Sequence, residues 1–335
     1  MDLSLTDEQQ QLTEAFARLY EHHATPERVR EAEPGGFDKA LWERLVETGA
    51  VAMAVPEAAG GWGASPVDLV LIAELHGRAV AAAPLIEAQV AARLLARLGQ
   101  PVADDRLVTL AAHPPVGGVA KLVPAAAVAD EALVYDGTRI VRVALDGART
   151  PVENLGSAPL ADVVVPADAE VLAEGPAAAA AFEQAWDEAL LLTAAALVGM
   201  GARVIEIAAA YARERKAWDV PIGSFQAVAH PLADAAAAVD GARLLAWKAA
   251  WSQHGDPTRA GELAALAFAF ASDTVNDATY HALHVHGGYG FMMEYDVQLY
   301  WRRARAWAQV WAAPAVAYRR AAAARAAQRA SEVAA

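Results

Sequence analysis

The sequence predicts a mainly α-helical fold with a small β domain. We expect an N-terminal helical domain over residues 1–105, a small middle β domain over 106–172, and a C-terminal four-helix bundle over 173–335. Three observations lead to this division: apolar residues at helical spacing near the N-terminus, short β-type runs with turn signals in the middle, and long alanine-rich helical stretches after them. This order of elements is uncommon, so it narrows the fold more than any one motif does.

The N-terminal helices are predicted from their caps and their periodicity. Residues 6–9 read Thr-Asp-Glu-Gln, which is a capping box, and apolar residues follow it at helical spacing. A second helix is expected around residues 41–46, and two more are expected over 68–80 and 86–98. Residues 55–63 are rich in proline and glycine and therefore predict a loop.

The middle domain is predicted from four short runs rich in β-branched residues. These runs span residues 107–110, 132–135, 140–143 and 163–165. Asp-Gly pairs at 136–137 and 146–147 are turn signals between such runs.

The bundle is predicted from long stretches of good helix formers. Four helices are expected over 176–214, 226–253, 259–285 and 297–330, and the last of them can break at Pro314. Small side chains dominate these stretches, which lets helices pack closely together.

Composition excludes several classes of function. The net charge of −14 argues against nucleic acid as a partner, because a surface that follows phosphates needs a basic excess. The chain has no cysteine, which excludes disulfides, thiolate zinc sites and cysteine nucleophiles, and we predict no metal site. Residues 1–8 lack the basic and apolar regions of a secretory signal, and charges interrupt the apolar runs before about 18 residues. We therefore expect no membrane span and a cytoplasmic protein.

Two segments in the C-terminal half do not fit a plain helical bundle. Residues 213–226 read Arg-Glu-Arg-Lys-Ala-Trp-Asp-Val-Pro-Ile-Gly-Ser-Phe-Gln, and residues 284–295 read His-Val-His-Gly-Gly-Tyr-Gly-Phe-Met-Met-Glu-Tyr. Glycine inside a helix costs about 1 kcal/mol relative to alanine. The glycines therefore indicate a place where the backbone must come close to another group.

On these segments the chain resembles the acyl-CoA dehydrogenases. That family carries Arg-Lys-x-Phe-Gly-x-Pro-Ile-x-x-Phe-Gln, similar to residues 215–226, followed by Leu-Ala-Asp as at 232–234. It also carries Gln-x-x-Gly-Gly-x-Gly-aromatic-x-x-Glu-Tyr, similar to residues 284–295, and Arg-Asp-Ala-Arg/Lys, similar to residues 302–305. The loop at 56–63 is similar as well, so the resemblance spans residues 1 to about 310, and the motifs are specific as a set.

The resemblance implies FAD held between subunits of a dimer or tetramer. It would place Arg215 and Trp218 at the pyrophosphate and adenosine part of the flavin, with Gln226 in the same region. An arginine fork suits a diphosphate. The alternatives are a surface ion pair of Arg215 with Glu214 or Asp219, and core packing for Trp218.

The second segment would line the adenine end of a flavin shared with a neighbouring subunit. The residues concerned are His284, Gly287 and Gly288. Paired glycines let backbone amides approach an anionic ligand. The alternative for the glycine pair is a plain helix C-cap and turn.

The family's catalytic base is missing from its usual place. The reaction removes the α-proton of an acyl-CoA and passes the β-hydride to the flavin, and the base is a carboxylate that follows the Arg-Asp-Ala-Arg element. Here no Asp or Glu occurs from Val297 to Ser331. Some members carry the base on the first bundle helix, at the position of Ala189, and Glu188 is its neighbour. One residue along a helix turns a side chain by about 100°, so Glu188 is a weak candidate, and a solvated residue near the helix N-terminus is the alternative.

Other departures concern the flavin ring and single positions. The β domain is truncated and lacks the segments by which family members grip the isoalloxazine ring. Asp219 stands where the family has glycine, Ala217 where it has a polar flavin contact, Arg303 where it has aspartate, and His284 where it has glutamine.

Four hypotheses follow for the function. The preferred one is the smaller subunit of a heteromeric acyl-CoA dehydrogenase, similar to the α2β2 enzymes of actinobacterial steroid catabolism, which supplies an FAD half-site while a second subunit supplies the base. Its substrate would be an acyl-CoA or steroid-CoA thioester, and its electron acceptor another flavoprotein. The alternatives are a homomeric dehydrogenase with a relocated base, an interaction subunit without FAD, and a flavin-free acyl-CoA enzyme that uses His or Asp for hydration or isomerisation. The histidines at 281, 284 and 286 form a cluster that keeps the last alternative open.

Overall fold

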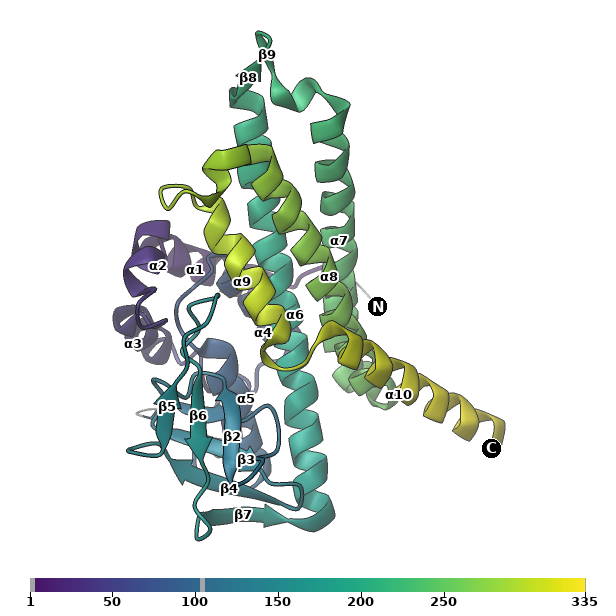
Figure 1. Cartoon of the computed structure of the whole chain (residues 1–335). Helices are drawn as coiled ribbons and strands as arrows, with labels where there is room; N and C mark the ends of the chain where they lie inside the picture. Colours follow the sequence, from purple (N-terminus) through teal and green to yellow (C-terminus); the bar gives the residue numbers. More distant parts are fainter. Residues whose placement is uncertain (1–3, 103–105, 335) are drawn as a thin grey trace.

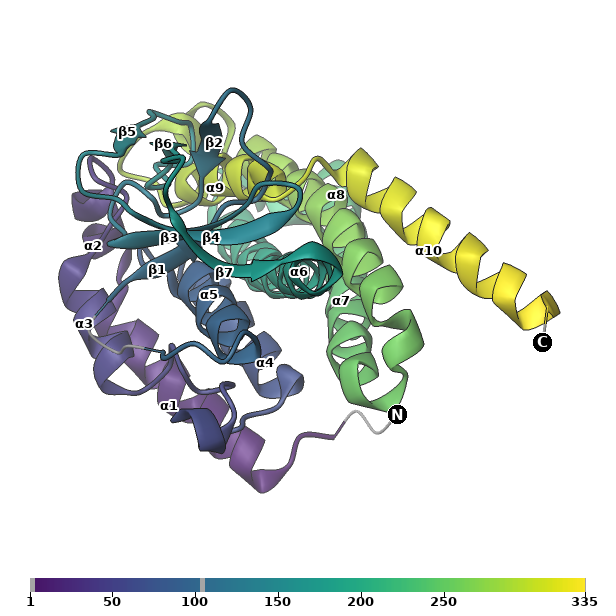
Figure 2. The same cartoon turned by 90° about the horizontal axis from the view of Figure 1, so that it is seen from below.

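The computed structural model describes residues 4–102 and 106–334, and it confirms the predicted mainly α-helical fold with a small strand domain. The longest helix, α6 (Gly175–Glu214), runs the length of the molecule in Figure 1. The strands lie beside its N-terminal end. Figure 2 shows α6 nearly end-on, with α4 (Pro66–Arg78) and α5 (Leu85–Arg97) on one side of it and α7 (Gln226–Gly255) and α8 (Ala260–His286) on the other.

Five α-helices and one 3₁₀ turn make up the described N-terminal region. They are α1 (Asp7–His23), α2 (Pro26–Ala32), α3 (Lys39–Glu47), η1 (Glu57–Ala59), α4 (Pro66–Arg78) and α5 (Leu85–Arg97). The capping box at Thr6 and Gln9 is present, and Ser65 and Asp68 form a second one at the start of α4. Helix α2 escaped the sequence analysis because it has seven residues and Val29 is the one it buries, so it carries no periodic apolar pattern.

The strands form two small sheets that enclose a core of their own. The first sheet has the order β1-β3-β4-β7 and the second has the order β2-β6-β5. The strands are β1 (Val108–Leu110), β2 (Val119–Val123), β3 (Glu131–Tyr135), β4 (Arg139–Ala144), β5 (Arg149–Pro151), β6 (Ala161–Val164) and β7 (Glu170–Glu174). Val134, Val143 and Val163 are buried in the shared core.

Strands β2, β5 and β7 are additional to the four predicted runs. Strand β5 has three residues and ends in a proline, and β7 has no fully buried residue, so neither shows the apolar alternation of a strand. The division into domains at 105 and 172 stays a prediction. Residue 105 lies outside the described residues, and β7 spans the second boundary.

The C-terminal bundle matches the predicted helices closely. After α6 come α7 (Gln226–Gly255), α8 (Ala260–His286), α9 (Val297–Val310) and α10 (Pro314–Ala334), with short 3₁₀ turns η2 (Ile222–Ser224), η3 (Pro257–Arg259) and η4 (Gly287–Phe291) between them. The predicted break falls at Pro314, where α10 begins and extends away from the body (Figures 1 and 2).

Helices α4 and α6 cross at two glycines. A Cβ atom added at Gly199 would overlap the carbonyl oxygen of Glu74, and one added at Gly77 would overlap the carbonyl oxygen of Ala196. The backbones are therefore in direct contact, which fixes the N-terminal helices against the bundle. This crossing places α4 and α5 over the helices that line the cavity described below.

Helix α6 is long and apolar enough to cross a membrane when judged by length and composition alone. However, 72% of its most apolar 18-residue window is buried inside the protein. Core helices of folded proteins meet the same criteria, so this helix is weak evidence for a span. Helix α6 packs against both α4 and α8.

Candidate functional site

A tight hairpin stands between α6 and α7, at one end of the bundle. Strands β8 (Lys216–Ala217) and β9 (Val220–Pro221) pair antiparallel, and the two residues between them, Trp218 and Asp219, have φ of 50° and 66°. Two successive left-handed residues make a type I′ turn, which joins hairpin strands with the correct twist. Aspartate tolerates this conformation better than most residues, so the turn accommodates Asp219.

Trp218 at the hairpin tip is not part of the core. Its side chain is 86% exposed, and its ring meets Phe225 edge-on with centroids 5.9 Å apart. The core-packing alternative for this residue is therefore wrong. The ring is therefore accessible to a ligand or to another chain.

Arg215 and Gln226 lie at the base of the same hairpin and are both exposed. The carbonyl oxygen of Arg215 accepts a hydrogen bond from the backbone N–H of Ile222 at 2.8 Å, which closes the hairpin. Among residues 4–102 and 106–334, no ion pair to Arg215 is found, so the proposed pairing with Glu214 or Asp219 does not form. Its guanidinium is available to an external anion.

The second segment ends α8. Gly287 has φ of 59° and ψ of −138°, a conformation that glycine adopts easily and other residues avoid, and it caps the helix. The C-cap alternative therefore holds for Gly287. A Cβ atom added at Gly287 or Gly288 would meet nothing within 4 Å, so the space beyond the cap is open. His284 is exposed on the last turn, with its ring 6.3 Å from that of Tyr280.

The two segments lie at the same end of the bundle. Tyr211, in the last turn of α6, stacks on His286 of α8 with ring centroids 4.2 Å apart. His286 is buried, and its Nδ1 lies 2.8 Å from the carbonyl oxygen of Ala282. It is therefore a core histidine with a satisfied ring nitrogen, and desolvation lowers its pKa below the usual value. The hydration or isomerisation alternative loses this member of its histidine cluster.

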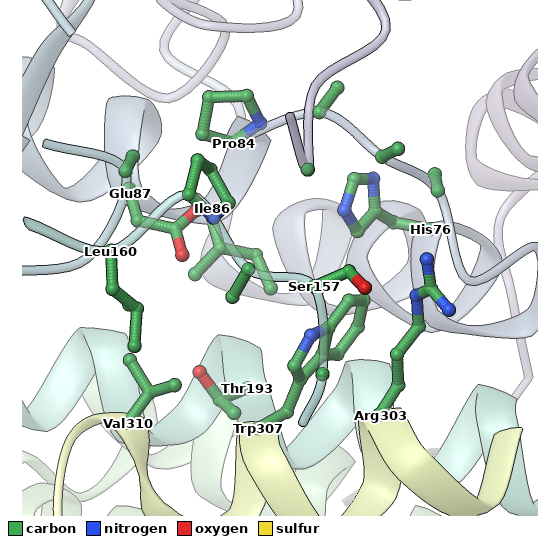
Figure 3. Close-up of a pocket in the computed structure, with 18 of the residues that line it drawn as sticks. His76, Pro84, Ile86, Glu87, Ser157, Leu160, Thr193, Arg303, Trp307 and Val310 are labelled. Atoms are coloured by element: carbon green, nitrogen blue, oxygen red, sulfur yellow. The ribbon is translucent and has the colours of Figure 1, made fainter. Parts of the chain in front are cut away.

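A separate cavity lies where α4, α5, the β5–β6 loop, α6 and α9 meet (Figure 3). Its volume is about 60 Å³. Glu87 and His76 lie at opposite sides of it, Thr193 comes from α6, and Arg303 and Trp307 come from α9 (Figure 3). Ligand sites for drug-sized molecules usually measure about 300–1,000 Å³, so this cavity is too small for a flavin ring or a long acyl chain.

Tryptophans occupy the region after the Arg-Arg-Ala-Arg element. Trp311 is 1% exposed and lines the cavity together with Trp307. Trp307 in turn stacks on His76 with ring centroids 6.0 Å apart. Trp311 thus belongs to the core, and both tryptophans form part of the cavity wall.

Arg303, which stands where the family has aspartate, has its own counter-charge. Its guanidinium is 3% exposed and donates a hydrogen bond to Glu33 at 3.1 Å. Arg302 also binds Glu33. Burial lowers the pKa of Arg303, and the carboxylate of Glu33 opposes this shift. The charge reversal is thus balanced locally, and Arg303 is not free to act on a ligand.

Glu188 is buried rather than solvated, contrary to the expected alternative. Its side chain is 5% exposed and accepts hydrogen bonds from Arg93 at 2.9 and 3.2 Å and from Arg97. It does not line the cavity that holds Trp307 and Glu87. Its carboxylate is already engaged by two arginines and does not face the cavity, so it is not placed to act on a ligand there.

Glu87 was not among the site residues predicted from the sequence. This residue is the one charged side chain between Arg78 and Arg93, in an otherwise apolar stretch, and that isolation was a usable signal. Its carboxylate points into the cavity (Figure 3), and desolvation raises its pKa to about 7. A carboxyl tuned in this way is typical of functional sites.

Comparison with known proteins gives matches along most of the chain. Residues 6–112 match the acyl-CoA dehydrogenase N-terminal domain, and residues 180–310 match the acyl-CoA dehydrogenase C-terminal domain. Acyl-CoA dehydrogenase IpdE2 of Mycolicibacterium smegmatis is 31% identical over 322 residues, covering 94% of this chain and 98% of that protein. Acyl-CoA dehydrogenase FadE27 of Mycobacterium tuberculosis is 29% identical, covering 91% and 93%.

Two solved structures extend this likeness to three dimensions. A variant of the steroid ACAD Tcur3481-Tcur3483 superposes with a TM-score of 0.87 at 26% identity, covering 97% of this chain and 99% of that one. The ChsE4-ChsE5 complex from Mycobacterium tuberculosis gives a TM-score of 0.85 at 27% identity, covering 100% and 99%.

Proposed function

Since the chain belongs to the acyl-CoA dehydrogenase family, whose members are FAD-dependent oxidoreductases of acyl-CoA thioesters, we propose that it is one subunit of a heteromeric member. It contributes an FAD half-site at the hairpin end of the bundle, and a partner subunit contributes the catalytic base. The observation that carries this proposal is Trp311, which is buried in the region where the family usually has its carboxylate.

The hairpin end of the bundle fits part of a dinucleotide. Arg215 is exposed and free of ion pairs within the described part of the chain, Trp218 offers a ring in solvent, and the space over Gly287 and Gly288 is open. In the assembled enzyme Arg215 would hold the diphosphate, and Trp218, Gln226 and His284 would lie along the adenosine part. FAD, when bound, supplies the hydride acceptor of α,β-dehydrogenation.

The interior does not fit a complete active centre. The cavity of about 60 Å³ cannot hold an acyl thioester beside a flavin ring. No Asp or Glu occurs from Val297 to Ser331, and Glu188 is neutralised by Arg93 and Arg97. Proton abstraction from the substrate is therefore assigned to the partner subunit, while this chain orients the cofactor and closes one side of the assembly.

Two related structures support the heteromer. The ChsE4-ChsE5 complex and the steroid ACAD Tcur3481-Tcur3483 both carry two-component names, and this chain covers almost the whole of one matched chain in each. We propose by this likeness a second acyl-CoA dehydrogenase subunit as partner, an acyl-CoA or steroid-CoA thioester as substrate, and a flavoprotein as electron acceptor.

The proposal is tested by purifying the chain alone and together with a co-expressed dehydrogenase subunit. We expect the lone chain to hold little FAD and to show no flavin bleaching on addition of acyl-CoA, and the co-purified complex to show both. Full FAD occupancy and turnover by the lone chain would contradict the proposal that the enzyme is a heteromer. If Glu87→Gln then abolished that turnover, the homomeric alternative with a relocated base would be supported, with Glu87 as the base in place of Glu188.

A further inference from the structure

The cavity contains a carboxyl group without a counter-charge. Glu87 lies in the first turn of α5, and its side chain points into the cavity (Figure 3). In the described part of the chain, no arginine, lysine or histidine pairs with it, and its carboxylate accepts a hydrogen bond from its own backbone N–H. Glu87 is half-buried, and a carboxylate that is partly removed from water without a partner costs stability, so stability alone explains this position poorly.

The other ionisable groups that line the cavity are already engaged. Arg303 is paired with Glu33 at 3.1 Å. His76 is buried, its Nδ1 lies 3.1 Å from the hydroxyl of Tyr20, and desolvation lowers its pKa to about 4. Neither group can neutralise Glu87, and both keep one protonation state near neutral pH.

The walls around Glu87 are mostly apolar. Ala83, Ile86, Leu160, Trp307 and Val310 form them, and the hydroxyls of Ser157 and Thr193 add two neutral polar groups. One water needs about 10–15 Å³ of such cavity volume, so a cavity of about 60 Å³ has room for a group of a few heavy atoms. The site therefore suits a short aliphatic group that carries one polar atom.

We propose that this cavity binds a neutral hydroxyalkyl group, whose hydroxyl hydrogen-bonds to Glu87 and whose carbon atoms pack against Leu160 and Trp307. A hydroxyl is both donor and acceptor, so it can pair with the carboxyl group in either protonation state. An anionic ligand would be repelled by the ionised carboxylate, and an ammonium group would lose its partner when the carboxyl group is protonated. The site goes beyond the proposed FAD half-site and does not depend on it.

Three probes of equal length and different head groups test this proposal: propan-1-ol, propylammonium and propionate. Binding to the full chain is followed by saturation-transfer NMR and by titration at pH 6 and pH 8. We expect propan-1-ol to bind at both pH values, and propionate to bind at least 10-fold more weakly at pH 8. Propylammonium should bind more weakly than the alcohol at pH 6.

Variants identify the place of binding. Glu87→Leu removes the polar partner and should weaken propan-1-ol about 10-fold, the usual value of one hydrogen bond. Glu87→Gln keeps a donor and an acceptor and should stay within about 3-fold of the natural chain. Leu160→Trp fills the cavity and should abolish binding of all three probes. Glu47→Gln, an exposed change on α3, serves as the control and should change nothing.

Several outcomes would overturn the proposal. The first is that propan-1-ol does not bind to the natural chain at any concentration tested. The second is that Glu87→Leu or Leu160→Trp binds propan-1-ol as tightly as the natural chain does. The third is that propylammonium binds more tightly than propan-1-ol at both pH values. Glu87→Gln keeps the test valid if Glu87→Leu does not fold. FAD occupancy of the same variants with the partner subunit is measured separately, so loss of the half-site and loss of this cavity site are told apart.

Discussion

Arg93 of α5 donates two hydrogen bonds to Glu188 of α6, at 2.9 and 3.2 Å. Arg97 binds the same carboxylate from the next turn of α5. The acid that the sequence offers as a relocated base is therefore the centre of a largely buried ion cluster that joins the N-terminal helices to the bundle. Its role is structural, and this assignment leads to the first prediction.

Glu188→Ala should destabilise the protein by about 3 kcal/mol, because it leaves two arginines without their shared carboxylate. Both arginines are partly exposed to water. The expected loss of stability is therefore at the lower end of the range for breaking buried ion pairs. Denaturant unfolding measures the change. Glu47→Ala, which breaks an exposed pair with Arg44, is the matched control and should cost under about 1 kcal/mol. Equal losses in the two variants would contradict the buried cluster.

Gly199→Ala should disrupt the crossing of α4 and α6. The added methyl group would overlap the carbonyl oxygen of Glu74, which is backbone and cannot rotate away. We expect a loss of about 2 kcal/mol or more in the free energy of unfolding. Gly241→Ala is the control, because its nearest neighbour is the ring of Phe270 at 3.8 Å. Gly241 is an exposed position on α7, so alanine there should stabilise the protein by up to about 1 kcal/mol. A loss of stability in Gly241→Ala would show that α7 is packed differently.

Glu87 should make stability depend on pH. Its pKa is raised from 4.5 in the unfolded chain to about 7 in the folded protein by desolvation. Between these values the unfolded state releases its proton while the folded state keeps it, so stability falls as pH rises from about 4.5 to 7. Glu87→Gln removes this part of the dependence, on the order of 1–3 kcal/mol, and should raise the Tm at pH 8 more than at pH 5.

Asp187 also makes stability fall as pH rises. In Glu87→Gln the stability should therefore depend less on pH, but the dependence should not disappear. Desolvation raises the pKa of Asp187 to about 6, while Arg320 opposes the shift. Unfolding curves between pH 5 and pH 8 separate the two, because the Asp187 contribution ends at the lower pH. A Tm gain in Glu87→Gln that is the same at every pH would refute the titration of Glu87.

Trp311 and Trp218 should respond to truncation in opposite ways. Trp311→Ala removes a fully buried ring and should cost about 3–5 kcal/mol in stability. Trp218→Ala removes a ring that is 86% exposed and should leave the free energy of unfolding within about 0.5 kcal/mol. In the co-purified complex, Trp218→Ala should nevertheless lower FAD affinity. A large stability loss from Trp218→Ala would show that the hairpin tip is packed inward.

The bundle could be predicted from the sequence because its helices are long and their ends are marked. Alanine-rich stretches favour helix, and Pro314 and the loop before Gln226 interrupt them clearly. Helix α2 and strands β5 and β7 were missed because they are short and bury few side chains. For such elements tertiary contacts decide the structure, and no local pattern reports them.

The exposure of the candidate FAD residues could be predicted in part from the sequence, while their role at a flavin stays a prediction. Arg215, Trp218 and Gly287 lie in or beside the turns that expose them. The local sequence motif therefore also determines their exposure. The environment of Glu188 depends on arginines about 90 positions earlier in the chain, and the cavity around Glu87 is closed by α9. Those contacts arise only when distant segments pack, and the sequence alone does not reveal them.

Arg215→Ala, with Arg44→Ala as a surface control, provides the decisive comparison in the complex with the partner subunit. FAD bound per heteromer is measured by flavin absorbance, together with acyl-CoA-dependent bleaching. A charged hydrogen bond contributes about 1.5–3 kcal/mol, so Arg215→Ala should weaken FAD binding by about 10–100-fold while the heteromer stays assembled. The control should keep its flavin. Unchanged FAD occupancy in Arg215→Ala would contradict the half-site on this chain.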